Sequence, residues 1–296
     1  MRIVSLLPST TEIVCDLGLS DQLLGVTVEC NWPTGVRDGR EIVVGTFSDP
    51  SMTPAEIDAI VRQRMADGLD LYELDDDALA RCNPELILSQ DLCRVCAVAS
   101  GDVDAAVQRL NCNANVLQID PQNLDEVIES INTIAIAAGV PDRGAKYCEE
   151  LRSRLRDVER AVSLTSPTTR PKVFVLEWIE PPFGAGHWVP DIISSAGGIP
   201  VVARPGQRSV QTTWTEIAAA SPDVVIVSPC GYGLNASADQ ARAVIDKLPN
   251  TAQVWAIDAD AVMVRPGPRL VDGVEAIAAM LHGINEVPAH VLRRVQ

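Results

Sequence analysis

Aromatic residues are scarce in this chain of 296 residues, which has five Trp, three Tyr and three Phe. No apolar run approaches the roughly 20 residues that a membrane-spanning helix needs. The opening stretch, Met1 to Leu7, is typical of a buried strand. A secretory leader would need a basic start, a longer apolar run and a small-residue cleavage site. As given, the sequence therefore predicts a cytoplasmic protein, although a trimmed mature chain from the periplasm or the cell exterior would look the same.

Several catalytic motifs are missing from the sequence. There is no G-x-G-x-x-G after a predicted strand and no lysine loop of the phosphate-binding kind, so nucleotide binding has no support. There is also no G-x-S-x-G and no H-E-x-x-H, the motifs of common hydrolases and zinc proteases. The three histidines, His187, His282 and His290, are scattered along the chain. The sequence therefore gives no support to an enzyme of these classes, and we expect a protein without catalytic activity.

Positive charge is also low, because 24 Lys and Arg stand against 40 Asp and Glu and give a net charge of −16. Nucleic acids and anionic membrane surfaces attract basic patches, so neither is an expected partner. A hydrophobic content of 47% is typical of a folded globular protein. The eight cysteines do not form a disulfide scaffold in a chain of this size, and several, such as Cys15 and Cys148, fall on apolar helix faces.

Short apolar runs alternate with helical patterns along the chain, from a strand at 2–6 to a helix at 268–281. This alternation predicts an α/β fold with parallel sheets covered on both faces. In such folds, ligands bind beyond the carboxyl ends of the strands. Between the clear elements, we expect an irregular stretch at 68–74, a short strand at 201–202 and a loop at 258–267.

Residues 141–165 predict one long helix in the middle of the chain. Its apolar residues, from Cys148 to Val162, recur at spacings of three and four, while charged residues cover its other faces. We expect it to connect an N-terminal α/β lobe, residues 1–140, to a C-terminal α/β lobe, residues 166–296, with a ligand cleft between the lobes. The alternative is an ordinary surface helix of one large domain.

The few aromatic rings gather in loops at the predicted carboxyl ends of the strands. Rings placed there would suit a large, flat, partly apolar ligand. About half of the rings are expected to belong to the core instead, and Trp255, inside a predicted strand, is the clearest case. The rings in or near these loops are Trp32, Phe47, Trp178, Phe183, Trp188, Trp214 and Tyr232.

The compact chemical motif of the chain is Cys93-Arg94-Val95-Cys96. It could be half of a zinc site, but no second C-x-x-C completes it. It could be a redox pair, although it does not begin a helix in a thioredoxin-like context. It could also be a pair of pocket thiols that contact a ligand or its metal, or two structural thiols. Cys230, at the equivalent strand end of the second half, favours the pocket.

Three motifs resemble a known family. SLLPSTTE, residues 5–12, resembles the opening of the helical-backbone class of solute-binding proteins of ABC importers, which bind cobalamin, ferric siderophores or haem. NPELI at 83–87 and PDVVI at 222–226 resemble the paired strands of that class. The stretch from Leu71 to Val98, which includes SQDLCRVCAV, resembles a cobalamin-binding subgroup.

The resemblance implies two Rossmann-like lobes joined by one long helix, with a corrin held between aromatic side chains at the lobe edges. It places Trp32, Phe47, Trp178 and Phe183 in the ligand pocket and Arg265 near a pocket arginine, whereas Trp214 aligns only across a gap. Together with the residues found by pattern, the expected ligand-binding set is Trp32, Phe47, Cys93, Cys96, Trp178, Phe183, Trp188, Trp214, Tyr232 and Arg265.

The resemblance also implies an ABC permease as partner, with one acidic residue of each lobe, Glu56 and Glu216, docking to its arginines. We expect a monomer that binds cobalamin or a related corrinoid as its ligand, with no catalytic cofactor and no metal ligands of its own. A cytoplasmic corrinoid carrier would use the same binding chemistry. The alternatives are a ferric siderophore or haem, for which Arg204 and Arg208 would join Arg94 and Arg265, and a metal- or redox-active protein that uses Cys93 and Cys96.

Overall fold

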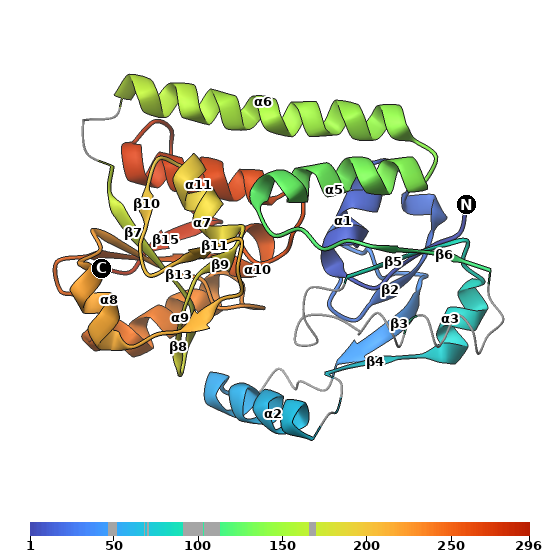
Figure 1. The fold of residues 1–296 in the computed structure, drawn as a ribbon, viewed down its shortest axis with the longest axis horizontal. Coiled ribbons are helices and arrows are strands. Elements are labelled where there is room, and N and C mark those ends of the chain that lie inside the picture. The colour runs from blue at the N-terminus through green and yellow to red at the C-terminus, as the bar shows by residue number, and fades with distance from the viewer. Residues whose placement is uncertain (47–51, 68, 70, 91–102, 104–112, 166–169) are drawn as a thin grey trace. The chain divides into compact units, whose positions relative to one another are not determined.

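The computed structural model describes residues 1–46, 52–67, 69, 71–90, 103, 113–165 and 170–296. The chain forms two compact units (Figure 1). The first unit consists of Met1–Asp120 and Glu129–Cys148, and the second of Pro121–Ile128 and Glu149–Gln296. Helices α5 (Leu124–Ala137) and α6 (Pro141–Thr165) therefore contribute residues to both units. The lobe boundaries expected from the sequence stay a prediction.

The first unit is built on a six-stranded sheet in the order β4-β3-β2-β1-β5-β6. All neighbouring strands are parallel except β3 and β4, which are antiparallel. Every residue of β1 and β5 is buried, as expected for central parallel strands that helices cover on both faces. The strands are β1 (Ile3–Ser5), β2 (Leu23–Thr27), β3 (Glu41–Thr46), β4 (Tyr72–Leu74), β5 (Leu86–Ser89) and β6 (Asn115–Gln118). The helices of this unit that the structure describes from end to end are α1 (Pro8–Asp16), α2 (Pro54–Ala66) and α3 (Asp76–Cys82).

The second unit has a seven-stranded sheet in the order β12-β8-β7-β13-β14-β15, with β10 also paired to β7. Its centre, β7-β13-β14, is parallel, and β13 is fully buried. The strands of this sheet are β7 (Lys172–Ile179), β8 (Pro182–Gly184), β10 (Ile199–Pro200), β12 (Val210–Gln211), β13 (Val224–Val227), β14 (Gln253–Ile257) and β15 (Leu292–Arg294). A separate two-stranded sheet pairs β9 (Gly186–His187) with β11 (Arg204–Pro205). The helices are α7 (Val189–Ser195), α8 (Trp214–Ala220), α9 (Leu234–Val244), α10 (Ala259–Val262) and α11 (Leu270–His282).

Helix α6 has the bounds that the sequence predicts. Pro141 suits its first turn, where a missing backbone N–H has no partner to lose. Within the second unit, Arg154 of α6 donates through Nη2 to Asp272 Oδ1 over 2.6 Å and through Nε to Glu275 Oε1 over 2.8 Å. The Glu275 carboxylate, and to a lesser extent the Asp272 carboxylate, raise the pKa of Arg154. The arginine therefore stays charged and links α6 to α11.

The α/β class with parallel sheets is confirmed, but three local predictions are wrong. Tyr72–Leu74 forms an edge strand, β4, where the sequence predicted an irregular stretch. The strand expected at 201–202 lies two residues earlier, as β10. The loop expected at 258–267 contains α10, because the Asp258 side chain caps it by accepting the Ala261 N–H over 3.1 Å. Among the described helices, none has the length and hydrophobicity that crossing a bilayer requires.

Candidate functional site

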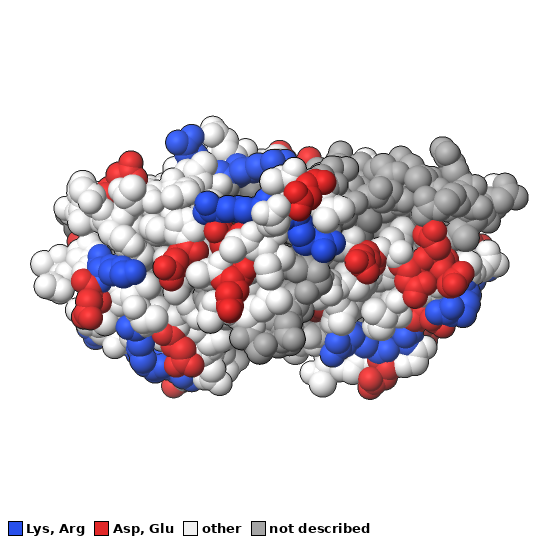
Figure 2. Space-filling model, turned by 90° about the horizontal axis from the view of Figure 1, so that it is seen from below, with Lys and Arg blue, Asp and Glu red and all other residues white. Residues whose placement is uncertain are grey.

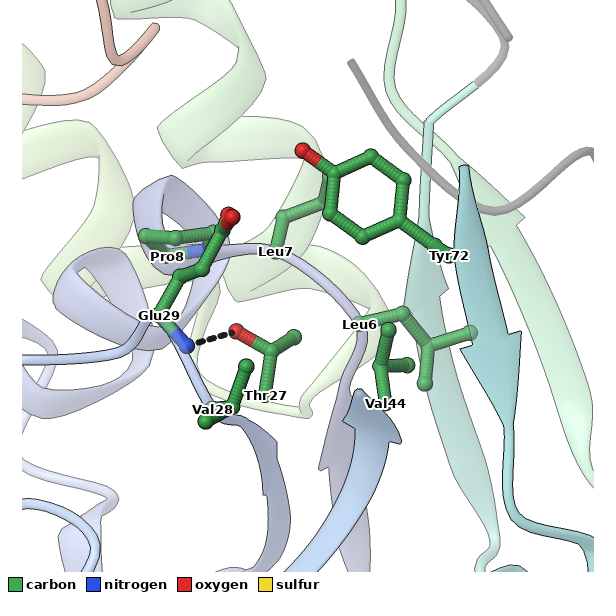
Figure 3. Close-up of a pocket in the computed structure, with 8 residues that line it drawn as sticks. All are labelled: Leu6, Leu7, Pro8, Thr27, Val28, Glu29, Val44 and Tyr72. Atoms are coloured by element: carbon green, nitrogen blue, oxygen red, sulfur yellow. Dashed lines mark hydrogen bonds between the residues drawn. The ribbon is translucent and has the colours of Figure 1, made fainter. Parts of the chain in front are cut away.

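In the first unit, the strand ends border a shallow pocket, which Figure 3 shows in close-up. Its volume is about 10 Å³, which is room for about one water molecule. Glu29 turns back over the end of β2 because its N–H donates to Thr27 Oγ1 over 3.2 Å. The pocket is lined by residues at or near the ends of four strands. They are Leu6, Leu7 and Pro8 after β1, Thr27, Val28 and Glu29 at and after the end of β2, Val44 in β3, and Tyr72 at the start of β4.

A buried polar network lies at the same strand ends. Ser5 Oγ lies 2.7 Å from Thr10 Oγ1 and accepts from Thr11 Oγ1 over 2.8 Å. Thr11 Oγ1 also lies 3.1 Å from the sulfur of Cys30, which accepts the Thr27 N–H over 3.4 Å. All five side chains are buried, so the network fixes the loops after β1 and β2, and Thr27 of this network also lines the pocket.

The predicted ligand residues of the first unit are only partly placed by the structure. Trp32 follows β2 and is 41% exposed. Phe47, Cys93 and Cys96 lie outside the described residues. Sequence reasoning missed Tyr72, which lines the pocket, because it did not recognise β4 and so had no strand end there to search.

In the second unit, the structure brings Trp178, Phe183 and Tyr232 together, and we call these three residues the aromatic cluster. The antiparallel pairing of β7 with β8 sets Trp178 opposite Phe183. The rings of Trp178 and Tyr232 lie edge to face with centroids 6.0 Å apart. All three side chains are half-buried, so the cluster combines fixed positions with accessible ring surface.

An ion pair between Asp260 and Arg265 lies beside the aromatic cluster. The Asp260 N–H donates to the Tyr232 carbonyl over 3.2 Å. Arg265 Nη2 lies 2.7 Å from Asp260 Oδ1 and 2.8 Å from Oδ2, and Arg265 is only 9% exposed. Burial raises the pKa of Tyr232 and that of the Asp258 carboxyl, which precedes α10. The predicted pocket arginine is therefore paired, and it holds the loop after β14 next to the aromatic cluster.

The remaining tryptophans of this unit have other surroundings. Trp188 is 6% exposed and donates its indole N–H to the Met263 carbonyl over 2.8 Å, so it packs inside the unit. Trp214 packs beside the core, with the Lys247 ammonium 5.4 Å from its ring centroid. The expectation that Trp255 is the clearest core ring is wrong, because it is half-buried near the sheet edge, opposite the exposed Arg294 of β15.

Sequence reasoning also missed Glu177, which precedes Trp178 on β7. Its Oε1 accepts the Gly186 N–H over 3.4 Å, and its Oε2 accepts a short hydrogen bond from Ser209 Oγ. Burial raises the pKa of this carboxyl to about 7, because the two hydrogen bonds offset only part of the desolvation. A period-2 pattern could have flagged it, since a lone acidic residue within a buried strand is unusual.

The two predicted docking carboxylates have the same local geometry. Glu56 Oε2 accepts from Thr53 N over 2.8 Å and from Thr53 Oγ1 over 2.7 Å, which begins α2 with a capping box. Glu216 Oε2 accepts from Thr212 Oγ1 and from Thr213 N, each over 2.9 Å, in the capping box of α8. These hydrogen bonds lower the pKa of both carboxyls, so both exposed groups carry a fixed negative charge at neutral pH.

Metal-binding and basic surfaces were also considered. Within the described residues, no group of three or more His, Cys, Asp or Glu is arranged to hold a metal ion. Cys230 is exposed, but the zinc, redox and pocket hypotheses for Cys93 and Cys96 stay predictions because both lie outside the described residues. On the face drawn in Figure 2, described basic and acidic side chains are interspersed, unlike the basic groove that nucleic acids need.

Two curated relatives are similar over nearly the whole chain. An uncharacterised ABC transporter substrate-binding lipoprotein, YvrC of Bacillus subtilis, is 24% identical over 95% of this chain and 80% of its own length. A vitamin B12-binding protein of Vibrio cholerae is 22% identical over 95% of this chain and 88% of its own length. Neither name gives a cytoplasmic location, so that expectation finds no support in these relatives.

Solved structures share the fold. The periplasmic vitamin B12-binding protein BtuF of Vibrio cholerae has a TM-score of 0.67 at 22% identity and covers 96% of this chain and 97% of its own. The periplasmic haem-binding protein RhuT of Roseiflexus sp. RS-1 has a TM-score of 0.70 at 19% identity, with coverages of 96% and 98%. At these identities the likeness concerns the fold alone. The family model of periplasmic binding proteins matches residues 3–263, and the chain therefore belongs to that family, as its motifs predicted.

Proposed function

We propose that this chain is the solute-binding protein of an ABC importer and that its solute is cobalamin or a related corrinoid. Family membership supports a binding role without catalysis. The similarity to an ABC transporter substrate-binding lipoprotein supports the importer, and the similarity to a vitamin B12-binding protein supports the solute.

The aromatic cluster is the observation that carries the choice of solute. Trp178, Phe183 and Tyr232 offer half-buried rings near the carboxyl ends of β7 and β13. Such rings bind large, partly apolar ligands by burying apolar surface of the ligand. The positive charge of the neighbouring Arg265 is already balanced by the Asp260 carboxylate. A corrin, whose side chains are largely neutral amides, fits this combination better than a ligand that brings several carboxylates to be neutralised.

Haem or a ferric siderophore is the second candidate. It is favoured by Arg204 and Arg208, two exposed residues in the segment that pairs with β9. Carboxylate and propionate groups are bound well by guanidinium groups, which offer planar pairs of donors. A solved haem-binding protein also shares this fold.

Calorimetric and absorption titrations of the full chain distinguish these solutes. We expect cyanocobalamin and hydroxocobalamin to bind with a Kd of about 1 μM or tighter, and haemin and a ferric catecholate to bind at least about 100-fold more weakly. Haemin binding without cobalamin binding would replace the corrinoid with haem. No binding of any of these compounds would leave the fold in place and remove all the proposed solutes.

The permease contact can be tested separately. We propose that the capping-box carboxylates Glu56 and Glu216 meet basic groups of the permease, since both are exposed and held in one rotamer by threonine hydrogen bonds. The double charge reversal Glu56→Lys and Glu216→Lys is expected to abolish complex formation with the permease in liposomes. Charge reversal of Glu85, an exposed acidic residue of the first unit, is the matched control. Equal complex formation by the wild-type protein and the double variant would refute this contact.

A further inference from the structure

Three helices of the second unit line a groove, which we call the helix groove. It lies between the start of α5, the part of α6 from Glu149 on, and α7. Its volume is about 590 Å³, within the ~300–1,000 Å³ of sites that bind small molecules. Its lining residues all belong to the second unit, and none of them is part of the aromatic cluster. The helix groove is therefore a second candidate site, separate from the one proposed for the solute.

The base of the helix groove is apolar. Leu124 and Ile128 lie one turn apart on α5, and both are buried. Leu155 of α6 is half-buried and completes this base. Apolar side chains of a ligand would lose contact with water when they pack on these three residues, which favours their binding.

Hydrogen bonds between separate segments hold the walls in place. The Leu124 N–H at the start of α5 donates to Asp191 Oδ2 of α7 over 3.1 Å. Arg170 Nη2 donates to the Ser194 carbonyl over 2.6 Å, which fixes the last turn of α7. A ligand therefore meets walls that are already ordered, and binding costs little rearrangement of the backbone.

The α6 wall carries two arginines. Arg152 and Arg156 lie one turn apart, so they share one face of the helix. Arg152 Nη2 lies 3.3 Å from Asp125 Oδ1, and Arg156 Nη2 lies 2.6 Å from Glu149 Oε1. The side chains of these two acids are 82% and 66% exposed, and ion pairs as exposed as these are weak. A carboxylate that binds two guanidinium groups at once can therefore compete with them.

The α7 wall offers acceptors. Asp191 is half-buried, and only its Oδ2 is used by the Leu124 N–H, so the carboxylate has capacity for an ammonium group. Ser194 Oγ donates to the Pro190 carbonyl over 2.9 Å and keeps lone pairs that accept from a peptide N–H. The two walls thus present groups that suit opposite charges.

We propose that the helix groove binds a short apolar peptide with free termini. Two arginines and two aspartates line it, so their formal charges cancel, and a zwitterion suits this lining better than a simple anion or cation does. The peptide carboxylate binds Arg152 and Arg156, its ammonium group binds Asp191, and its side chains pack on the apolar base. The volume holds a few residues and excludes a folded partner.

The test is calorimetric titration of the full chain with trileucine and with two derivatives that each lack one charge. We expect trileucine to bind with a Kd of about 1 mM or tighter. N-acetyl-trileucine lacks the ammonium group, and trileucine amide lacks the carboxylate. Each should bind at least about fivefold more weakly, because one charged hydrogen-bonded contact is lost.

Two variants assign the charged contacts to residues. Arg156→Gln should weaken trileucine at least about fivefold and leave trileucine amide unchanged, since the amide has no carboxylate to lose. Asp191→Asn keeps an oxygen for the Leu124 N–H, and it should weaken trileucine but not N-acetyl-trileucine. Arg160→Gln is the control, because Arg160 is exposed on the same helix and is not among the lining residues. Damage to the fold would weaken all three peptides alike, so the pattern across the peptides separates binding from stability.

Several outcomes would overturn the proposal. One is the absence of trileucine binding at concentrations up to about 5 mM. Another is equal affinity of all three peptides for the wild-type protein and both variants. Tighter binding of dodecanoate than of trileucine would assign the helix groove to an amphipathic acid instead. Displacement of trileucine by cyanocobalamin would place the peptide at the solute site, whereas an unchanged trileucine affinity supports a separate site. The peptide titrations give their answer even if cyanocobalamin does not bind, so the two proposals can fail independently.

Discussion

The indole of Trp178 meets the phenol of Tyr232 edge to face, with ring centroids 6.0 Å apart and an angle of 66° between the ring planes. Trp178 lies near the end of β7, and Tyr232 follows β13, which is the parallel neighbour of β7. The sheet order therefore creates this contact between residues 54 positions apart. Edge-to-face geometry suits the ring quadrupoles and holds both rings in place before a ligand arrives.

Removal of one of these rings should weaken ligand binding. We expect Trp178→Ala to raise the Kd for cyanocobalamin about tenfold, or ~1.4 kcal/mol, because a preformed apolar surface is lost. Calorimetric titration measures the change. Trp255→Ala is the control, since Trp255 is also half-buried in the second unit but lies outside the aromatic cluster. An unchanged Kd in Trp178→Ala would remove this residue from the site.

The pair of Asp260 and Arg265 should matter for stability. Asp260→Ala leaves the largely buried guanidinium of Arg265 without this carboxylate, and we expect it to lower the free energy of unfolding by about 2–3 kcal/mol. Urea unfolding at pH 7 gives the value. The double variant Asp260→Ala and Arg265→Met should recover part of the loss, because it no longer buries a charge. A loss in the double variant equal to the sum of the single losses would contradict this explanation.

Gly186 should tolerate no side chain. Gly186→Ala would drive a methyl group into the backbone of Gln207, Arg208 and Ser209, and we expect a loss of about 1–3 kcal/mol in the free energy of unfolding. Gly45→Ala is the control, because a Cβ at Gly45 meets no atom of the described residues within 4 Å. Thermal and urea unfolding of both variants compare the two positions. Equal stability of the two variants would show that the backbone of residues 207–209 can move aside.

The capping box of α8 should contribute measurably to its stability. Thr213 Oγ1 accepts the Glu216 N–H over 3.2 Å, and Thr213→Ala removes this acceptor from the helix start. We expect a loss of about 1 kcal/mol in the free energy of unfolding. The neighbouring Thr215→Ala is a matched control, because Thr215 is exposed within the helix and makes no cap. The prediction fails if both substitutions cost the same.

Glu177 should make the stability of the protein depend on pH. Its folded-state pKa, about 7, lies above the ordinary value of 4.5, so folding favours the protonated form. The stabilisation is fully present below about pH 4.5 and is lost as the pH rises through 7, by up to about 3 kcal/mol. Urea unfolding of the wild-type protein and of Glu177→Gln across this window should show this slope in the wild-type protein alone. The same slope in both proteins would assign it to other groups.

The sequence alone determined the elements whose signals are local. The apolar spacing in residues 141–165 predicted α6 with its observed bounds, since a helix buries residues three and four apart. The PDVVI motif at 222–226 similarly indicated a strand, and the structure has β13 there, buried at every position. The motifs at 5–12, 83–87 and 222–226 also predicted the family that the comparison confirmed.

Only the tertiary structure decided which distant residues meet. Glu177 and Ser209 are 32 positions apart, and no local pattern links a glutamate in β7 to a serine in the segment between β11 and β12. Tyr72 became a pocket residue once β4 paired with β3, and a three-residue edge strand carries almost no signal of its own. Local periodicity reports which face of an element is buried, whereas sheet order and loop closure depend on contacts summed over the whole unit. The chain thus encodes its helices and central strands locally, and its site through the order in which those strands pack.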